Sequence, residues 1–169
     1  MALAQLPVGV VLAVVGNAAQ IPLFSEQVKT LKLSQRVFFL GSLSDVGPAY
    51  EAADCLVHPT LEDTFAMVVL EAMSYGLPVI VSSSRYCGIS DILHHGENAL
   101  IVDDPLDPSE LRHALEQALT QPLLYAQLSR GAITFARCYQ WSSLALQQES
   151  LYLDVTAAKN CSGYSSQTM

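Results

Sequence analysis

Basic residues are scarce in this sequence. Its 169 residues include eight Lys and Arg against sixteen Asp and Glu, which gives a formal net charge of −8 at pH 7. The summed field of such a chain repels phosphate backbones and anionic lipid headgroups. We therefore expect neither nucleic-acid binding nor charge-driven membrane binding as its main function, and any anionic ligand must be held by local groups.

Paired cysteines and long apolar runs are also absent. The apolar run from Val8 to Val15 is too short to cross a bilayer, so no integral membrane segment is expected. No Lys or Arg precedes Lys29, so the chain lacks the basic start of a secretory signal. The cysteines are scattered without a CxxC pair, which favours reduced structural thiols and a cytoplasmic protein over disulfides or zinc: Cys55, Cys87, Cys138 and Cys161.

The patterns that are present alternate between strand and helix. The length suits one globular domain, and the sequence predicts an α/β fold, a Rossmann-like parallel sheet of about five or six strands with helices on both faces. This domain is expected over residues 1–158, followed by a disordered tail over 159–169. The predicted strands are 8–16, 36–41, 56–58, a strand from Pro78 and 99–102, and the predicted helices are 22–33, 46–53, 65–75, 89–95, one from Pro108, 123–137 and 142–157.

The helix expected over 65–75 is the most informative segment. Apolar residues cover almost every side of it, which predicts a buried helix, yet Glu71 lies in its middle. A buried carboxylate needs hydrogen-bond donors, so Glu71 must meet protein donors or face a cleft where a ligand supplies them. The other interpretation of Glu71 is a helix carboxylate that is capped by its neighbours or simply exposed.

Ligands of open parallel sheets bind at the carboxyl ends of the strands. The loops expected there begin at Gly16-Asn17, Gly41, Pro59 and Ser82. The first N–H groups of the helix that follows Asp63 form an anion site without basic side chains, near Phe65, Ala66, Met67 and Val68. Asp63 is itself favoured at a helix N-terminus for purely structural reasons. It lies about 12 Å from Glu71 along the helix axis, too far for an acid–base pair around one glycosidic bond.

An ordered series of short motifs accompanies this helix. It resembles the C-terminal domain of the retaining GT-B glycosyltransferases, the family 4 type with an E-x7-E motif, and is most similar to lipopolysaccharide-core glucosyltransferases. The resemblance runs from about Val8 to Leu153. The residues that carry it include Leu12-Ala-Val-Val-Gly16, Val37-Phe-Phe-Leu-Gly41, Tyr50-Glu-Ala-Ala-Asp54, Phe65, Glu71-Ala-Met73, Gly76, Pro78-Val-Ile80, Cys87-Gly-Ile89, Asp107-Pro108 and Trp141.

The resemblance implies a role for each matching position. Glu71 would accept hydrogen bonds from the ribose of a nucleoside diphosphate sugar, and Asp63 would position the donor sugar in the catalytic site. The remaining donor-binding positions would be Gly16, Asn17, Leu40, Gly41, Thr64, Phe65, Ala66, Met67 and Val68. The resemblance implies no metal and no cofactor besides the donor, which we expect to be UDP-glucose. The family usually has Glu at the position of Asp63 and Gly at that of Ala66.

The family's diphosphate-binding Arg and Lys, and its acceptor-binding N-terminal domain, have no counterpart in these residues. We therefore expect the donor-binding half of a longer enzyme that transfers hexose to a saccharide or lipid-linked cell-surface glycan. This half alone is expected to be inactive. The whole protein would be cytoplasmic, with attachment to the inner membrane through the missing domain as an alternative.

Two functions of other classes remain as alternatives. A non-catalytic α/β regulatory or nucleotide-binding module is the first, although a receiver domain would carry acidic residues where this chain has Gly16-Asn17. A dinucleotide-dependent oxidoreductase is disfavoured, because G-x-G-x-x-G does not follow the first strand.

Overall fold

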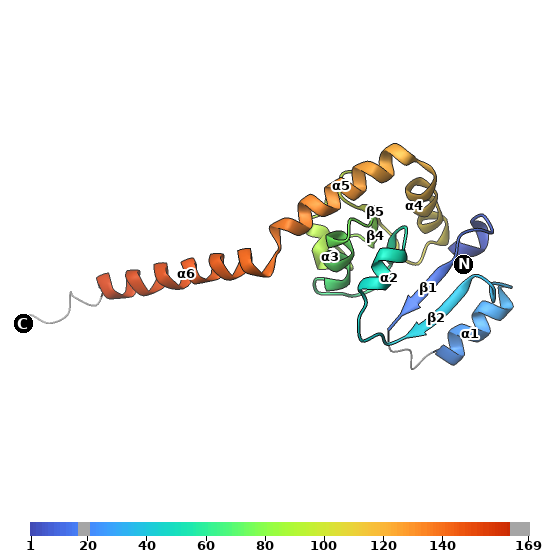
Figure 1. The fold of residues 1–169 in the computed structure, drawn as a ribbon, viewed down its shortest axis with the longest axis horizontal. Helices are drawn as coiled ribbons and strands as arrows, with labels where there is room; N and C mark the ends of the chain where they lie inside the picture. The colour runs from blue at the N-terminus through green and yellow to red at the C-terminus, as the bar shows by residue number, and fades with distance from the viewer. Residues whose placement is uncertain (17–20, 163–169) are drawn as a thin grey trace, which may run out of the picture.

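The computed structural model describes residues 1–16 and 21–162 of the chain. Five strands and six α-helices alternate along it, with two short 3-10 helices, as the α/β prediction requires (Figure 1). The strands are β1 Leu12–Val15, β2 Val37–Gly41, β3 Leu56–His58, β4 Val79–Ser82 and β5 Leu100–Val102. The helices are η1 Ala2–Gln5, α1 Ile21–Thr30, α2 Gly47–Ala52, α3 Met67–Ser74, η2 Gly88–Asp91, α4 Pro108–Thr120, α5 Pro122–Cys138 and α6 Trp141–Ser162.

All strand pairings are parallel, as predicted, but the strands form two sheets instead of one. β1 pairs with β2, and a second sheet has the order β3-β4-β5. No pairing joins β1 to β3 within the described residues. The expectation of one sheet with five or six strands is therefore correct in class and in strand count, and wrong in continuity.

The first strand differs most from its prediction. The sequence predicts a strand over 8–16, but β1 covers only Leu12–Val15, and three of its four residues are exposed. No residue of β1 belongs to either of the two apolar clusters that form the core, so its faces lack the helix cover that β4 has. The apolar composition therefore predicted a strand correctly, but it did not predict that most of the strand is exposed.

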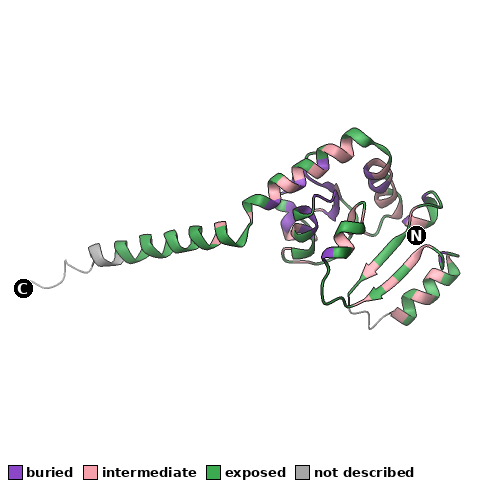
Figure 2. Ribbon diagram, viewed as in Figure 1, coloured by how far each residue is buried: buried purple, intermediate pink, exposed green. Residues whose placement is uncertain are grey.

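The core lies around the three-stranded sheet. Every residue of β4 is buried, and its side chains alternate between two apolar clusters because successive residues of a strand point to opposite faces. Val79 and Val81 pack with α3 and α5, whereas Ile80 packs with α4 and η1. Figure 2 shows this buried centre surrounded by exposed segments. Helices thus cover both faces of this sheet.

Helix α3 is bounded by two left-handed residues. It begins at Met67, two residues later than predicted, because Ala66 has φ 55° and ψ 65°. It ends at Ser74 before Gly76, whose φ of 76° is the predicted left-handed position after the helix. The N–H of Gly76 donates to the carbonyl of Met73, and that of Leu77 to the carbonyl of Ala72, which completes a Schellman motif.

The C-terminal helices follow their sequence signals, with one extension. Asp107 caps α4 by accepting a hydrogen bond from the N–H of Ser109, next to Pro108 in the first turn. The helix expected over 89–95 is only the 3-10 turn η2. Helix α6 extends away from the rest of the molecule (Figure 1) and continues to Ser162, into the segment expected to be disordered. Residues 163–169 lie outside the described residues.

A membrane-spanning segment was not expected. Among the residues that the structure describes, no helix combines the length and the apolar character needed to cross a membrane.

Candidate functional site: the outer face of α3

Glu71 lies on an exposed face of α3, so the expectation of a fully buried helix is wrong. Val69, Ala72 and Met73 face the core. The opposite side carries Glu71 between Met67 and Val68, which are 43% and 40% exposed, and Tyr75. Apolar residues on every side of a helix do not bury it unless neighbouring elements cover every side. Here one side is left open, and it is apolar around a single carboxylate.

Among the described residues, Tyr50 is the side chain that donates a hydrogen bond to the carboxylate of Glu71. The hydroxyl of Tyr50, in α2, donates a hydrogen bond of 3.0 Å to Oε2 of Glu71. The Tyr50 ring also packs against Tyr75 with centroids 5.4 Å apart, which holds α2 beside α3. A carboxylate accepts at about four lone-pair positions, so Glu71 retains the capacity to accept from a pair of ligand hydroxyls.

Tyr50 is a stable donor in this pair. Burial, followed by the hydrogen bond and charge of Glu71, raises the pKa of Tyr50 to about 12. Its hydroxyl therefore stays protonated at neutral pH and fixes the orientation of one oxygen of Glu71. The sequence offered Tyr50 only as part of a family motif, and nothing in its local pattern indicated contact with a residue 21 positions away.

Asp63 is engaged by the protein itself. Its Oδ1 accepts from the N–H groups of Ala66 at 2.6 Å and Phe65 at 3.2 Å, and its Oδ2 lies 3.1 Å from Nε2 of His58. The amides of Phe65 and Ala66, expected to hold donor oxygens, are therefore not free. The N–H groups of Met67 and Val68 remain, since the first turn of a helix offers them no intrahelical acceptor.

The electrostatics of Asp63 agree with these hydrogen bonds. Burial pushes its pKa upward, but the hydrogen bonds from Ala66, His58 and Phe65 outweigh burial and hold the pKa of Asp63 below its ordinary value. The side chain is 31% exposed. It is thus an ionised group that fixes the turn before α3 and still presents an edge to solvent.

A second loop locks this turn in place. The N–H of Asp63 donates to the carbonyl of Tyr86, and the N–H of Gly88 donates at 3.0 Å to the carbonyl of Asp63. A side chain at Gly88 would overlap the carbonyl oxygen of Thr64, so only glycine permits this approach. Ser82, fully buried, donates to the carbonyl of Thr60 at 2.7 Å. Ser82 therefore holds the loop that contains Thr60.

The structure brings two of the predicted glycines together. The N–H of Gly16 donates to the carbonyl of Gly41 at 2.9 Å, where β1 and β2 end. Both have positive φ, 134° and 70°, which explains why glycine stands at each strand end. Leu40 is 47% exposed on β2. Asn17 lies outside the described residues.

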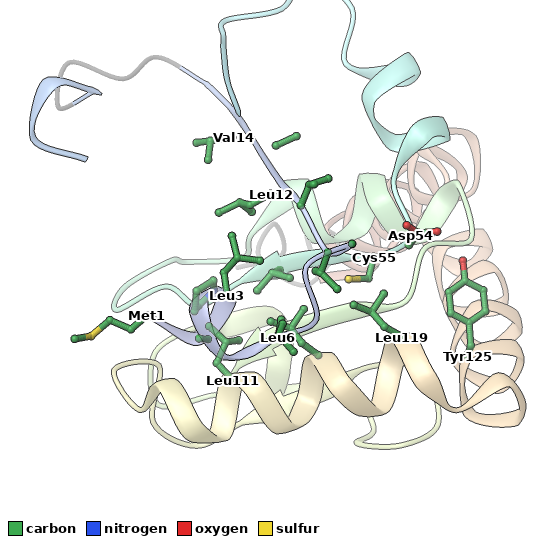
Figure 3. Close-up of a pocket in the computed structure, with 18 residues that line it drawn as sticks. Met1, Leu3, Leu6, Leu12, Val14, Asp54, Cys55, Leu111, Leu119 and Tyr125 are labelled. Carbon is green, nitrogen blue, oxygen red and sulfur yellow. The ribbon is translucent and has the colours of Figure 1, made fainter. Parts of the chain in front are cut away.

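The predicted residues thus form three local groups: Gly16 with Gly41, Asp63 with the amides at the start of α3, and Glu71 with Tyr50. One cavity of about 680 Å³ is lined by residues of η1, β1, β3 and α4 among others, and none of the predicted site residues lines it (Figure 3). Among the described residues, no three His, Cys, Asp or Glu side chains gather as a metal site.

Comparison with known proteins identifies the family. The model of glycosyl transferases group 1 matches residues 2–135. The chain belongs to this family. It is similar to the D-inositol 3-phosphate glycosyltransferase of Corynebacterium glutamicum (strain R), with 30% identity over 83% of this chain and 33% of the relative. It is also similar to the lipopolysaccharide glucosyltransferase WaaG of Escherichia coli (strain K12), with 30% identity over 67% of this chain and 30% of WaaG.

Solved structures share the fold, among them that of the glycosyltransferase WaaG. HepE of Anabaena, crystallised with UDP, superposes with a TM-score of 0.80 at 26% identity, over 91% of this chain and 43% of HepE. The structure of WaaG gives a TM-score of 0.73 at 29% identity, over 80% of this chain and 37% of that one. The GT-B resemblance is thereby confirmed. This chain spans about a third of the length of the curated relatives that it matches.

Proposed function

We propose that this chain binds a nucleoside diphosphate sugar as the donor-binding half of a retaining glycosyltransferase. The observation that carries the proposal is Glu71, an exposed carboxylate on a group 1 glycosyltransferase helix, with one oxygen held by Tyr50. A neighbour in fold, HepE, has been crystallised with UDP-glucose. That ligand supports UDP-glucose as the donor for this chain as well.

In this proposal Glu71 accepts hydrogen bonds from the two ribose hydroxyls. Tyr50 fixes Oε2, so the carboxylate meets the ribose diol in one orientation and loses little side-chain entropy on binding. Met67 and Val68 supply apolar contact beside it, and their N–H groups face the diphosphate oxygens at the positive end of α3.

Asp63 has a smaller part than its family position implies. Three donors already occupy its carboxylate, which leaves about one acceptor position for a hydroxyl of the donor sugar. Its main contribution is to hold the turn that aims the first amides of α3. Gly16, Gly41 and Leu40, with Asn17 beyond the described residues, would form the wall beside the nucleotide.

The transfer reaction is proposed for a protein of the relatives' length. It would move a hexose to a saccharide or lipid-linked acceptor with retention of configuration. This chain's residues would position the donor and stabilise charge on the leaving diphosphate, without a covalent nucleophile. Cytoplasmic placement and the absence of a metal requirement are parts of the same proposal.

Titration calorimetry tests donor binding directly. The chain is titrated with UDP, UDP-glucose, ADP-glucose, GDP-mannose and NAD, and we expect heat with the uridine nucleotides. Glu71→Gln should weaken UDP binding about tenfold, because a charge-assisted acceptor becomes a neutral one. Glu62→Gln is the matched control, since Glu62 is an exposed carboxylate outside α3. Heat with NAD alone, or equal effects of the two variants, would contradict the proposal.

A further inference from the structure

The carboxylate of Asp63 keeps one acceptor position, and the structure shows which oxygen carries it. A carboxylate oxygen accepts at about two lone-pair positions. Oδ1 accepts from the N–H groups of Ala66 and Phe65, so both of its positions are used. Oδ2 lies 3.1 Å from Nε2 of His58 and has one position left. Because the side chain of Asp63 is 31% exposed, part of the carboxylate faces solvent and is open to a ligand.

His58 is the donor in its contact with Asp63. The pKa of Asp63 lies below its ordinary value of 3.8, so at neutral pH the carboxylate is ionised and only accepts hydrogen bonds. Nε2 of His58 must therefore carry the hydrogen, whether the ring is neutral or protonated. Since this donor occupies one lone pair of Oδ2, His58 sets the direction from which a further hydroxyl can approach the other.

The backbone that carries His58 is held in place. His58 is the last residue of β3 and pairs with Val81 of the fully buried strand β4. Its carbonyl accepts from the N–H of Thr60 at 2.9 Å, and the carbonyl of Thr60 accepts from Ser82 at 2.7 Å. The side chain of His58 is 24% exposed. A donor at the end of a packed strand holds its acceptor more precisely than a donor on a loop.

We propose that His58 is a positioning residue that decides which sugar epimer the donor site accepts. It acts through Asp63, by directing the free lone pair of Oδ2 toward a single hydroxyl of the donor sugar. This inference rests on the proposed function, in which Asp63 lies against the donor sugar.

A single acceptor reads the orientation of a single hydroxyl. Epimeric hexoses differ in the axial or equatorial placement of one hydroxyl, and the wrong epimer leaves the ionised oxygen without its donor. Loss of a hydrogen bond to a charged group lowers affinity about tenfold or more. Without the hydrogen bond from His58, both lone pairs of Oδ2 are free, so the carboxylate accepts from hydroxyls in more than one direction. The discrimination between epimers then falls.

The test is titration calorimetry of the chain with UDP, UDP-glucose and the epimers UDP-galactose, UDP-mannose and UDP-allose. His58→Asn should remove about a tenfold preference for UDP-glucose over one of these epimers. His58→Gln should keep most of that preference, because the amide nitrogen of glutamine reaches as far as Nε2 of histidine and that of asparagine does not. UDP, which has no hexose, should bind the natural chain and both variants equally.

His113→Asn is the matched control, because His113 is an exposed histidine of α4, and it should leave all these affinities unchanged. The pKa of Asp63, measured by NMR without ligand, gives a second readout. Burial raises this pKa, while the hydrogen bonds from Ala66, His58 and Phe65 lower it. It should therefore rise in His58→Asn and stay low in His58→Gln.

Epimer preferences that are unchanged in His58→Asn would overturn the role of His58, and so would an unchanged pKa of Asp63. An equal loss of affinity for UDP and UDP-glucose would overturn it too, because His58 would then support the fold and not the sugar contact. Absence of UDP binding to the natural chain would instead refute the proposed function. If His58→Asn fails to fold, equal affinities of the natural chain for all the epimers, or loss of the preference in His58→Gln, would overturn the inference.

Discussion

Gly88→Ala tests the packing that holds the turn before α3. A Cβ at this position would overlap the carbonyl oxygen of Thr64 and lie 3.1 Å from its carbonyl carbon. Both obstacles are backbone, so no side-chain rotation relieves them. The loops over residues 63–66 and 83–88 must move apart, which strains or breaks the hydrogen bond from the N–H of Gly88 to the carbonyl of Asp63.

The expected cost combines two terms. Overpacking in a closely packed region costs about 1–3 kcal/mol, and the hydrogen bond adds about 1 kcal/mol. We therefore expect the free energy of unfolding to fall by about 2–4 kcal/mol. For a chain of this length that corresponds to a decrease in Tm of roughly 5–15 °C. Urea unfolding followed by circular dichroism gives the free energy, and a thermal melt gives the Tm.

Gly9→Ala is the matched control. Gly9 has no heavy atom within 4 Å of a built Cβ and does not have positive φ, so its substitution should change stability by less than about 0.5 kcal/mol. If Gly88→Ala is as stable as Gly9→Ala, the close approach of the two loops is refuted. The turn that carries Asp63 would then have to be held in another way.

Three further substitutions examine α3 and the turn that precedes it. Asp63→Asn should lower the free energy of unfolding by about 1 kcal/mol at pH 7, because charge-assisted bonds become neutral ones. The folded pKa of Asp63 lies below its ordinary value of 3.8, so this contribution is present above pH 3.8 and is lost as the pH falls through the folded pKa. In urea unfolding from pH 7 to pH 2.5, the free energies of unfolding of the natural chain and of Asp63→Asn should therefore converge. A difference that stays constant over this range would contradict the role of Asp63. Met73→Ala should lower the free energy of unfolding by about 2–5 kcal/mol because Met73 is fully buried. Met67→Ala, on the exposed face, should lower it by less than about 1 kcal/mol. Equal losses of free energy in a denaturant titration would show instead that both faces of α3 are packed.

Local signals in the sequence predicted most elements. The strand over Leu56–His58 has its predicted bounds, and Gly76 takes the left-handed position after α3. Pro108 and Asp107 mark the start of α4. These features depend on backbone preferences and on capping by residues a few positions away, so a short stretch of sequence is enough to predict them.

The candidate site was predicted less completely. The sequence indicated Glu71, Asp63 and the amides at the start of α3, but it did not indicate that Asp63 takes two of those amides for itself. The Tyr50 partner of Glu71 was also missed. Both contacts depend on the path of the backbone between the residues that meet. For Asp63 that path includes Ala66, which adopts a left-handed conformation that alanine rarely takes.

By itself the sequence determined the class of fold, the order of strands and helices, and the family, because apolar periodicity and short motifs are local properties. Only the tertiary structure decided that one face of α3 stays open, that Gly88 locks the turn of Asp63, and that β1 and β3 face each other across a cavity. Burial and edge pairing depend on which surfaces meet in space, and an apolar residue has the same periodicity in the sequence whether or not a neighbour covers it.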